Sequence, residues 1–212
     1  ALGLEKLRKY AEEFGLGETS GLEIPESEPQ ISDDSSVPSA IGQGTNNYTT
    51  SQLARYITAI ANKGTVFKLS LLDKVSSVNG KVIKDYEPEV RNTITNVADS
   101  TWSAVHEGMR NVVISEHGDL FPNLNASDIK LSGKTGTAQQ SKTHPDHGLF
   151  VGFAPSDNPE VAFATRIANG YSSTFAAEVG NAVLEYYYEI LPEEEIITGN
   201  ATKIKITQSG GD

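Results

Sequence analysis

The stretch from Ser132 to Gln140, SGKTGTAQQ, combines residue types that can hold a carboxylate and an oxyanion. The Lys134 ammonium supplies a fixed positive charge, and the hydroxyls of Thr135 and Thr137 can donate to a carboxylate. Gly136 removes a side chain where a ligand or a neighbouring helix must come close. The backbone of such a strand can pair with an extended peptide, and an N–H near Thr137 can stabilise an oxyanion. This pattern favours a strand edge that holds a peptide.

The same stretch has two alternative interpretations. The first is a P-loop, because Gly133-Lys134-Thr135 resembles its last positions, but that motif requires Gly at position 128, where this sequence has Asp. A P-loop also requires a helix directly after the Thr, and residues 138–148, which contain Pro145, do not favour one. The second is an ordinary strand with a surface Lys134. Lys-Thr-Gly alone does not decide between them, so the rest of the sequence must.

A nucleophile for this site is hard to find in the sequence. The one Ser-x-x-Lys, Ser127-Asp128-Ile129-Lys130, would lie in the lead-in to the Lys-Thr-Gly strand, where residues three apart point to opposite faces and cannot pair easily. The two Ser-x-Asn matches, Ser77-Val78-Asn79 and Ser156-Asp157-Asn158, are better explained as turns. We therefore expect none of these serines to be catalytic.

The remaining candidate clusters favour structural roles. His144-Pro145-Asp146-His147 is typical of a solvated turn, so no metal site is predicted there. His106 and His117 have no clear partner in the sequence. Tyr186-Tyr187-Tyr188 indicates helix packing and surface, and Glu193-Glu194-Glu195 indicates a solvated charged run. We expect no cofactor.

Composition narrows the function classes. The chain has 212 residues, of which 37% are hydrophobic, which is enough for one domain or a large part of one. A formal net charge of −11 argues against a nucleic-acid or anionic-membrane surface. The sequence contains no Cys, which excludes thiol catalysis, thiolate metal sites and disulfides. No apolar run in the sequence is long enough to span a membrane.

The elements that would position the site follow from periodicity and turn signals. A layered fold is predicted, of the α/β or more specifically the α+β class, in which helices cover an antiparallel sheet. An Asn79-Gly80 hairpin with a type I′ turn is expected between residues 75 and 83. An extended surface segment is expected over residues 18–48. Helices are predicted over residues 2–14, from a cap at Thr49 or Thr50 to Gly64, from a cap at Asp99 or Ser100 to Val113, and over 174–190, and strands over 129–137, 149–154 and 161–167.

Five segments, taken together, resemble the penicillin-recognising serine enzymes, and most closely the transpeptidase domain of class B penicillin-binding proteins. The resemblance covers about residues 1–190, with its segments in the family's order, and residues 191–212 are expected to form a partly ordered tail. The segments are YAEEFGLG at 10–17 with TSGL at 19–22 and Pro25, AIGQG at 40–44, YTTSQLA at 48–54 with ANKG at 61–64, GKTGTA at 133–138, and FVGFAP at 150–155.

The resemblance implies acyl transfer. A Ser attacks the D-alanyl-D-alanine end of a peptidoglycan stem peptide, an amine of a neighbouring peptide resolves the acyl-enzyme, and β-lactams acylate the same Ser. Lys134, Thr135, Gly136 and Thr137 would bind substrate, the Thr137 backbone would belong to the oxyanion hole, and Gln139 would line the exit of the cleft. Peptidoglycan stem peptides, β-lactams and other cell-wall synthesis proteins are the implied partners of the whole protein.

Such enzymes need Ser-x-x-Lys and Ser-x-Asn motifs upstream of Lys-Thr-Gly. Residues 2–14 resemble the part of the family that follows the second motif, so we expect both motifs to precede residue 1 and the isolated chain to be inactive. An extracytoplasmic protein anchored through an N-terminal segment outside this sequence is implied, and the chain could associate with the absent half or with a swapped copy. Two alternatives stay open: a non-catalytic sensor or binding module, and a serine β-lactamase, against which no Glu-x-x-Leu-Asn is found.

Overall fold

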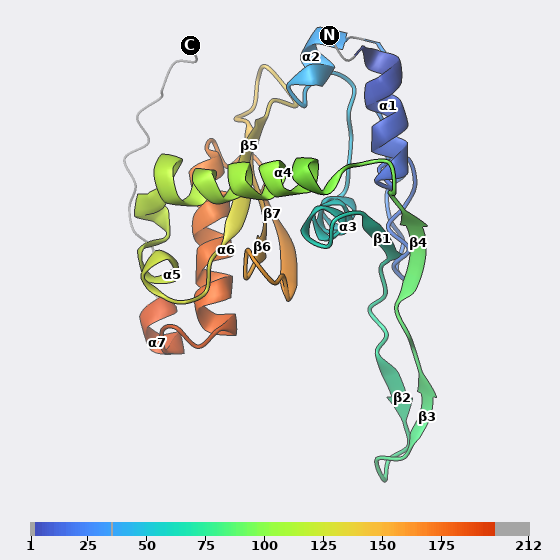
Figure 1. The fold of residues 1–212 in the computed structure, drawn as a ribbon, viewed down its shortest axis with the longest axis vertical. Helices are drawn as coiled ribbons and strands as arrows, with labels where there is room; N and C mark the ends of the chain where they lie inside the picture. The colour runs from blue at the N-terminus through green and yellow to red at the C-terminus, as the bar shows by residue number, and fades with distance from the viewer. Residues whose placement is uncertain (1–2, 35, 198–212) are drawn as a thin grey trace.

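A three-stranded antiparallel sheet forms the centre of the molecule (Figure 1). The computed structural model describes residues 3–34 and 36–197. The strands are β5 (Ser132–Ala138), β6 (His147–Ala154) and β7 (Val161–Ile167), in the order β5-β6-β7. Within the described residues, β5 and β7 are therefore edge strands. All three predicted strands are confirmed, although β5 begins three residues later and β6 two residues earlier than expected.

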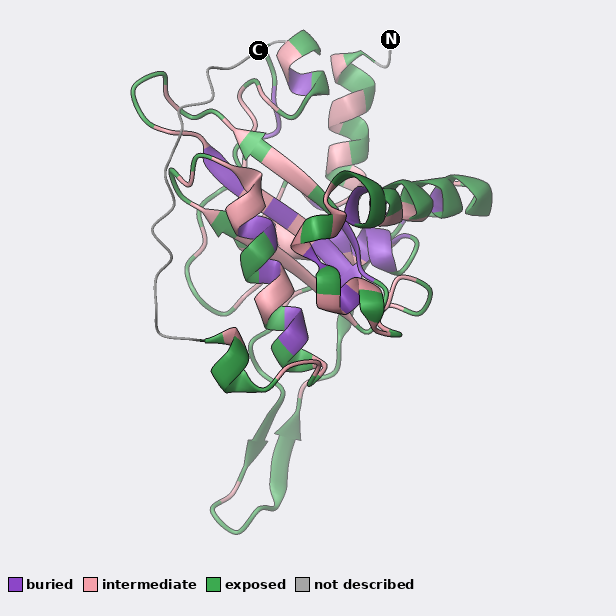
Figure 2. Cartoon of the chain, turned by 90° about the vertical axis from the view of Figure 1, so that its left-hand side faces the viewer, coloured by how far each residue is buried: buried purple, intermediate pink, exposed green. Residues whose placement is uncertain are grey.

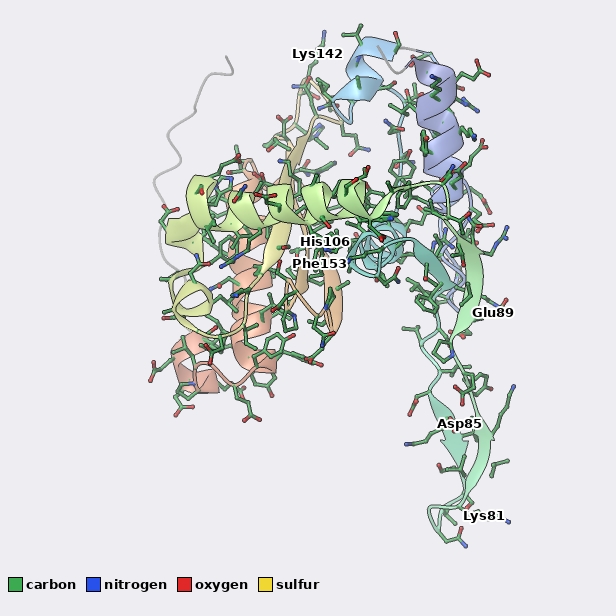
Figure 3. The ribbon with its side chains drawn as sticks, in the orientation of Figure 1. Lys81, Asp85, Glu89, His106, Lys142 and Phe153 are labelled. Atoms are coloured by element: carbon green, nitrogen blue, oxygen red, sulfur yellow. The ribbon has the colours of Figure 1, made fainter. Side chains whose placement is uncertain are left out.

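Helices cover both faces of this sheet, which confirms the layered α+β fold. The α6 helix (Ser173–Tyr187) packs on the face that carries Phe150 and Phe163, and Gly180 lets the helix approach both rings. The α3 helix (Thr50–Ala61) and the α4 helix (Asp99–Asn111) cover the opposite face, where His106 of α4 contacts Phe153 with ring centroids 4.8 Å apart (Figure 3). Each face thus has its own apolar core, and buried residues concentrate around the strands (Figure 2).

The N-terminal third wraps around α3. The α1 helix (Leu4–Glu13) agrees with its prediction, and the short α2 helix (Ser36–Ala40) interrupts the segment that was expected to be extended. Thr49 caps α3 through a capping box with Gln52, as its position in the sequence indicated. Arg55 of α3 is 2% exposed, and its guanidinium donates to the backbone carbonyls of residues 15, 18 and 19. The loop after α1 is therefore fixed to α3.

Two β-ribbons separate α3 from α4. The first pairs β1 (Thr65–Lys68) with β4 (Glu89–Thr93), and the second pairs β2 (Lys74–Ser76) with β3 (Val82–Asp85) and projects from the body, with Lys81 near its tip (Figure 3). The hairpin is confirmed, but the predicted type I′ turn is wrong. Only Gly80 of its central pair has a positive φ, and the Gly80 N–H donates to the Ser77 carbonyl.

Short helices lead from α4 to β5. Ala98 occupies the N-cap position of α4, without a side-chain hydrogen bond, so the predicted cap at Asp99 or Ser100 is wrong. A π-helical turn (Val112–Glu116), a 3-10 turn (Gly118–Leu120) and α5 (Pro122–Ala126) follow α4. Tyr188, after α6, donates a hydrogen bond from its hydroxyl to the Ala154 carbonyl, whereas Tyr186 and Tyr187 are exposed.

The described chain ends just after the α7 helix (Glu193–Ile196), so most of the predicted tail lies outside the described residues. In the part that is described, no helix has the length and apolar character needed to cross a membrane.

Candidate functional site

Of the predicted site residues, Lys134, Thr135, Gly136 and Thr137 lie on β5, at the edge of the sheet that is open within the described residues, and Gln139 follows the end of this strand. Thr135 is paired with Phe150 and Thr137 with Gly148, so both threonines lie on the face that α6 covers. Lys134 is paired with Val151 and starts on the opposite face, because successive residues of a strand alternate. The structure thus brings Lys134 and the two threonines together only if the lysine turns over the strand edge.

The Lys134 side chain makes that turn. Its Nζ lies 3.0 Å from the Thr135 carbonyl oxygen, to which it donates, and 3.5 Å from Thr135 Oγ1. The Thr135 carbonyl therefore faces the edge of β5 that is not paired with β6. In an antiparallel strand, alternate residues direct their N–H and C=O groups to the same side, so the Thr137 N–H faces this edge as well. The Lys134 ammonium and the Thr135 hydroxyl meet at this edge, and strand alternation places the Thr137 N–H along it.

The Lys134 ammonium has room for an external anion. Lys134 is exposed, and among the described residues no Asp or Glu carboxylate forms a salt bridge with it. A lysine ammonium has three donors, and the Thr135 carbonyl and hydroxyl are neutral acceptors that leave its charge unbalanced. Because no described carboxylate already pairs with Lys134, a ligand carboxylate at this edge would not have to displace one.

The two glycines of the stretch have different surroundings. A Cβ on Gly133 would lie 2.3 Å from the Phe150 ring, so packing inside the sheet requires glycine there. A Cβ on Gly136 would meet only Leu149 Cβ, at 3.6 Å, among the described residues. Gly136 also has no positive φ. Neither packing nor backbone conformation in the described chain explains Gly136, and the space beside it is open.

The segment after β5 contains a hydrogen-bonded histidine that was not predicted from the sequence. Gln139 and Gln140 are both exposed, and Gln140 places Oε1 2.6 Å from His147 Nε2. His147 Nδ1 lies 2.9 Å from the Asn169 backbone nitrogen. Burial lowers the pKa of His147, and the Arg166 charge lowers it further, against the opposing effect of Asp146.

The expectation of a solvated turn is therefore wrong for His147, which is buried as the first residue of β6, although His144 is exposed. The alternation of His147 with Leu149, Val151 and Phe153 on one face of β6 is the sequence signal that could have identified it. Among the described residues, no three His, Cys, Asp or Glu side chains are grouped in a way that could hold a metal ion.

The serines of the chance motifs serve local structure. Ser127 Oγ donates to the Leu124 carbonyl at 2.9 Å and accepts from the Ile129 N–H, so it caps the end of α5. Lys130 is exposed and is not a hydrogen-bond partner of Ser127. Ser77 lies in the hairpin turn, and Ser156 lies between β6 and β7 with its hydroxyl against that of Ser132. Among the described residues, no lysine Nζ is a hydrogen-bond partner of any of these serine hydroxyls.

A cavity of about 620 Å³ lies elsewhere, between α1, residues 15–18 and 29–33, and the β1–β4 ribbon. It is half open and is lined by charges of both signs, including Arg8, Arg91 and Glu18, and Arg91 is already paired with Glu18 at 2.9 Å. No residue of β5 lines it. The candidate site is thus a strand edge rather than an enclosed pocket.

Comparison with known proteins identifies the class to which this fold and strand edge belong. The sequence matches the family model of the penicillin binding protein transpeptidase domain over residues 1–185. The chain therefore belongs to this family, as the resemblance indicated.

The relatives are class B penicillin-binding proteins. Penicillin-binding protein 2B of Streptococcus pneumoniae is 30% identical over 208 residues, which cover 87% of this chain and 30% of the relative. The peptidoglycan D,D-transpeptidase MrdA of Haemophilus influenzae is 28% identical, with 92% of this chain and 34% of that protein covered. The structure of S. pneumoniae penicillin-binding protein 2B matches with a TM-score of 0.72 at 28% identity, over 89% of this chain and 33% of that one. The chain thus spans about a third of the length of the relatives it matches.

Proposed function

We propose that this chain forms the substrate-binding wall of a peptidoglycan D,D-transpeptidase. In this proposal the Lys134 ammonium and the hydroxyls of Thr135 and Thr137 bind the terminal carboxylate of a D-alanyl-D-alanine stem peptide. The Thr137 N–H is one donor of the oxyanion hole, where it stabilises the negative charge that develops on the carbonyl oxygen under attack. Gly136 leaves space for the peptide, and Gln139 lines the exit of the cleft. The name of the MrdA relative supports the reaction class.

The observation that carries the proposal is the unbalanced charge of Lys134 at an unpaired strand edge. An extended peptide that adds to β5 would bond to the free backbone groups while its carboxylate approaches Nζ. A β-lactam presents a carboxylate and an amide-like carbonyl, and it would use the same donors. A P-loop, the rival interpretation, is not supported, because β5 continues through Thr135 to Ala138 without a helix.

The nucleophile of the proposed reaction comes from residues outside these 212. Ser127 is engaged in capping α5, and the sequence has no other Ser-x-x-Lys. The activating lysine and the Ser-x-Asn motif would come from the same outside region, which would face the bound peptide across the open edge of β5. We also propose that the whole protein acts outside the cytoplasm, where peptidoglycan is cross-linked, anchored to the membrane by a segment outside this sequence. Other cell-wall synthesis proteins would be its partners there.

The experiment is an NMR titration of the ¹⁵N-labelled chain with N-acetyl-D-alanyl-D-alanine and with benzylpenicillin, on the wild type and on Lys134→Met. We expect the amide resonances of Thr135, Gly136 and Thr137 to shift in the wild type. Lys134→Met should weaken binding about tenfold or more, because a hydrogen bond to a charged group is lost.

Lys130→Met is the matched control, since Lys130 is exposed just before β5 and only its backbone carbonyl is engaged, by the Ser156 N–H. It should bind as the wild type does. Equal weakening in both variants, or shifts that avoid β5, would refute the proposed wall.

A further inference from the structure

His147 lies where three segments of the chain meet. It is the first residue of β6 and is paired with Ala138, the last residue of β5. Gln140, from the segment that leaves β5, contacts one side of its ring, and the backbone of Asn169, from the turn after β7, contacts the other. The imidazole therefore connects the exit of the Lys-Thr-Gly strand to the turn that follows β7, at the same end of the sheet.

The two hydrogen bonds define one protonation state of the ring. The Asn169 backbone N–H can only donate, so His147 Nδ1 must accept and carries no proton. Gln140 Oε1 can only accept, so Nε2 carries the proton and donates across 2.6 Å. His147 is thus neutral, with its proton on Nε2. Protonation at Nδ1 would set two N–H groups against each other and break the contact with Asn169.

The surroundings resist that protonation. The ring is 8% exposed, and Gly148 lets the Ser172 backbone approach so closely that a Cβ there would lie 2.3 Å from the Ser172 carbonyl oxygen. The charged groups that act on the ring are Arg166, from β7, and Asp146, from the β5–β6 loop. The turn at 168–172 and the first turn of α6 contribute no charged side chain.

The turn that His147 holds is under backbone strain. Asn169 and Tyr171 have φ values of 53° and 63°, in the left-handed region that side chains other than glycine seldom adopt. The Tyr171 N–H donates to the Asp146 carbonyl at 3.1 Å, beside the bond from Asn169 to His147. These bonds hold the turn against the start of β6, so the ring is attached to a fixed support and not to a loose loop.

We propose that neutral His147 is a positioning residue, which holds Gln140 and thereby fixes the end of β5 where Thr137 offers its backbone N–H to a ligand. The role rests on the proposed function, because the geometry it maintains is that of the carboxylate and oxyanion donors. It adds a dependence on pH: protonation of His147 at Nδ1 breaks the bond from the Asn169 N–H that fixes the ring, so the ring no longer holds Gln140 and the segment after β5 in place, and binding at the strand edge weakens.

A pH titration of the ¹⁵N-labelled chain tests the coupling without any ligand. Ring ¹⁵N shifts should report the Nε2–H tautomer at pH 7.5. The amide resonances of Thr137 and Ala138 should titrate with the same midpoint as His147, below the pH at which an exposed histidine titrates. Amide resonances of β5 that stay constant while His147 titrates would overturn the inference.

Gln140→Ala separates positioning from folding. Gln140 is exposed, so this variant should retain the wild-type melting temperature and the His147–Asn169 bond, yet the Thr137 amide should no longer follow His147. Lys142→Ala, at an exposed position of the same loop, is the control and should keep the coupling. Coupling that survives in Gln140→Ala would contradict the inference, because the link would then run through another path.

Ligand titrations at pH 7.5 and pH 5 distinguish this inference from the proposed function. With N-acetyl-D-alanyl-D-alanine as the probe, wild-type binding should weaken about fivefold at the lower pH, as expected when one hydrogen bond is lost, and Gln140→Ala should bind equally at both. Binding that is equal at both pH values in the wild type contradicts the role of His147 and leaves the proposed function intact. If the Thr137 amide titrates together with His147 but the chain binds no N-acetyl-D-alanyl-D-alanine at either pH, the proposed function is contradicted, whereas the coupling of His147 to β5 is confirmed.

Discussion

At the scale of single residues, the site depends on how side chains share one strand edge. Lys134 and the two threonines belong to opposite faces of β5. Lys134 Nζ still reaches the Thr135 carbonyl and hydroxyl, because its long side chain can cross an edge that no strand of the described chain covers. A shorter cation on the same face could not make this contact. The open edge is therefore as much a part of the site as the residues on it.

The two glycines of β5 give a prediction that separates binding from folding. Gly136→Ala should leave stability close to that of the wild type, because among the described residues its Cβ would meet only Leu149, at 3.6 Å, and it should weaken binding of N-acetyl-D-alanyl-D-alanine by filling the ligand space. Gly133→Ala should destabilise the fold by about 1–3 kcal/mol through overpacking against Phe150. Urea unfolding and the NMR titration measure the two effects. Equal loss of stability in both variants would show that Gly136 is structural.

The strand that carries Lys-Thr-Gly and its candidate binding groups could be predicted from the sequence, because both depend on neighbouring residues. For His147 the signal is weaker: its alternation with Leu149, Val151 and Phe153 indicates a buried face, but its partners, Gln140 and Asn169, are separated from it by a loop and by the whole of β6 and β7. A His-Pro-Asp-His string has the composition of a solvated turn, and tertiary contacts bury its last member. Burial that arises from tertiary pairing leaves a weak signal in the sequence.

At the scale of elements, the least predictable part is the segment between α1 and α3. Its Gly, Pro and acidic residues indicated an extended surface segment, but Ser20 and Ser32 are fully buried, and Glu26 accepts hydrogen bonds from the hydroxyls of Ser20 and Ser51 and from the Gly21 N–H. Arg55 anchors the same segment from α3. These contacts join residues far apart in the chain, which local composition does not report. By contrast, α3 and β7 were predictable because a cap or a turn marks their ends.

Glu26 provides a test of this anchoring through pH. Burial opposes ionisation of its carboxylate, but the hydrogen bonds from Ser20, Ser51 and Gly21 outweigh it and hold its pKa below 4.5. A carboxylate with a lowered pKa contributes stability above its unfolded-state pKa, and this is lost as the pH falls through the folded value. Glu26→Gln should therefore cost about 1 kcal/mol at pH 7 and progressively less below pH 4.5.

Urea unfolding at pH 7 and pH 4 measures that difference. Glu28→Gln is the control, because Glu28 is exposed nearby and none of the described hydrogen bonds or salt bridges includes it, so its free energy of unfolding should match the wild type at both pH values. A cost for Glu26→Gln that is the same at both pH values would contradict the ionised anchor.

At the scale of the whole molecule, the sheet has both edges unpaired within the described residues. The full sequence carries a formal net charge of −11. It spans about a third of the length of the class B penicillin-binding proteins that it matches. The family and the layered fold could be predicted because motifs are spread in order along the sequence. Association with another segment or a second copy could not be derived in the same way, since an interface depends on a partner, and it stays a prediction.

The central claim is that this chain supplies the binding wall and not the nucleophile. The most direct measurement is the intact mass of the 212-residue chain after prolonged incubation with benzylpenicillin, with a complete serine penicillin-binding enzyme as the positive control. We expect an unchanged mass for this chain and an adduct on the control. An increase by one benzylpenicillin, located on Ser127 or on any other serine of the chain, would contradict it.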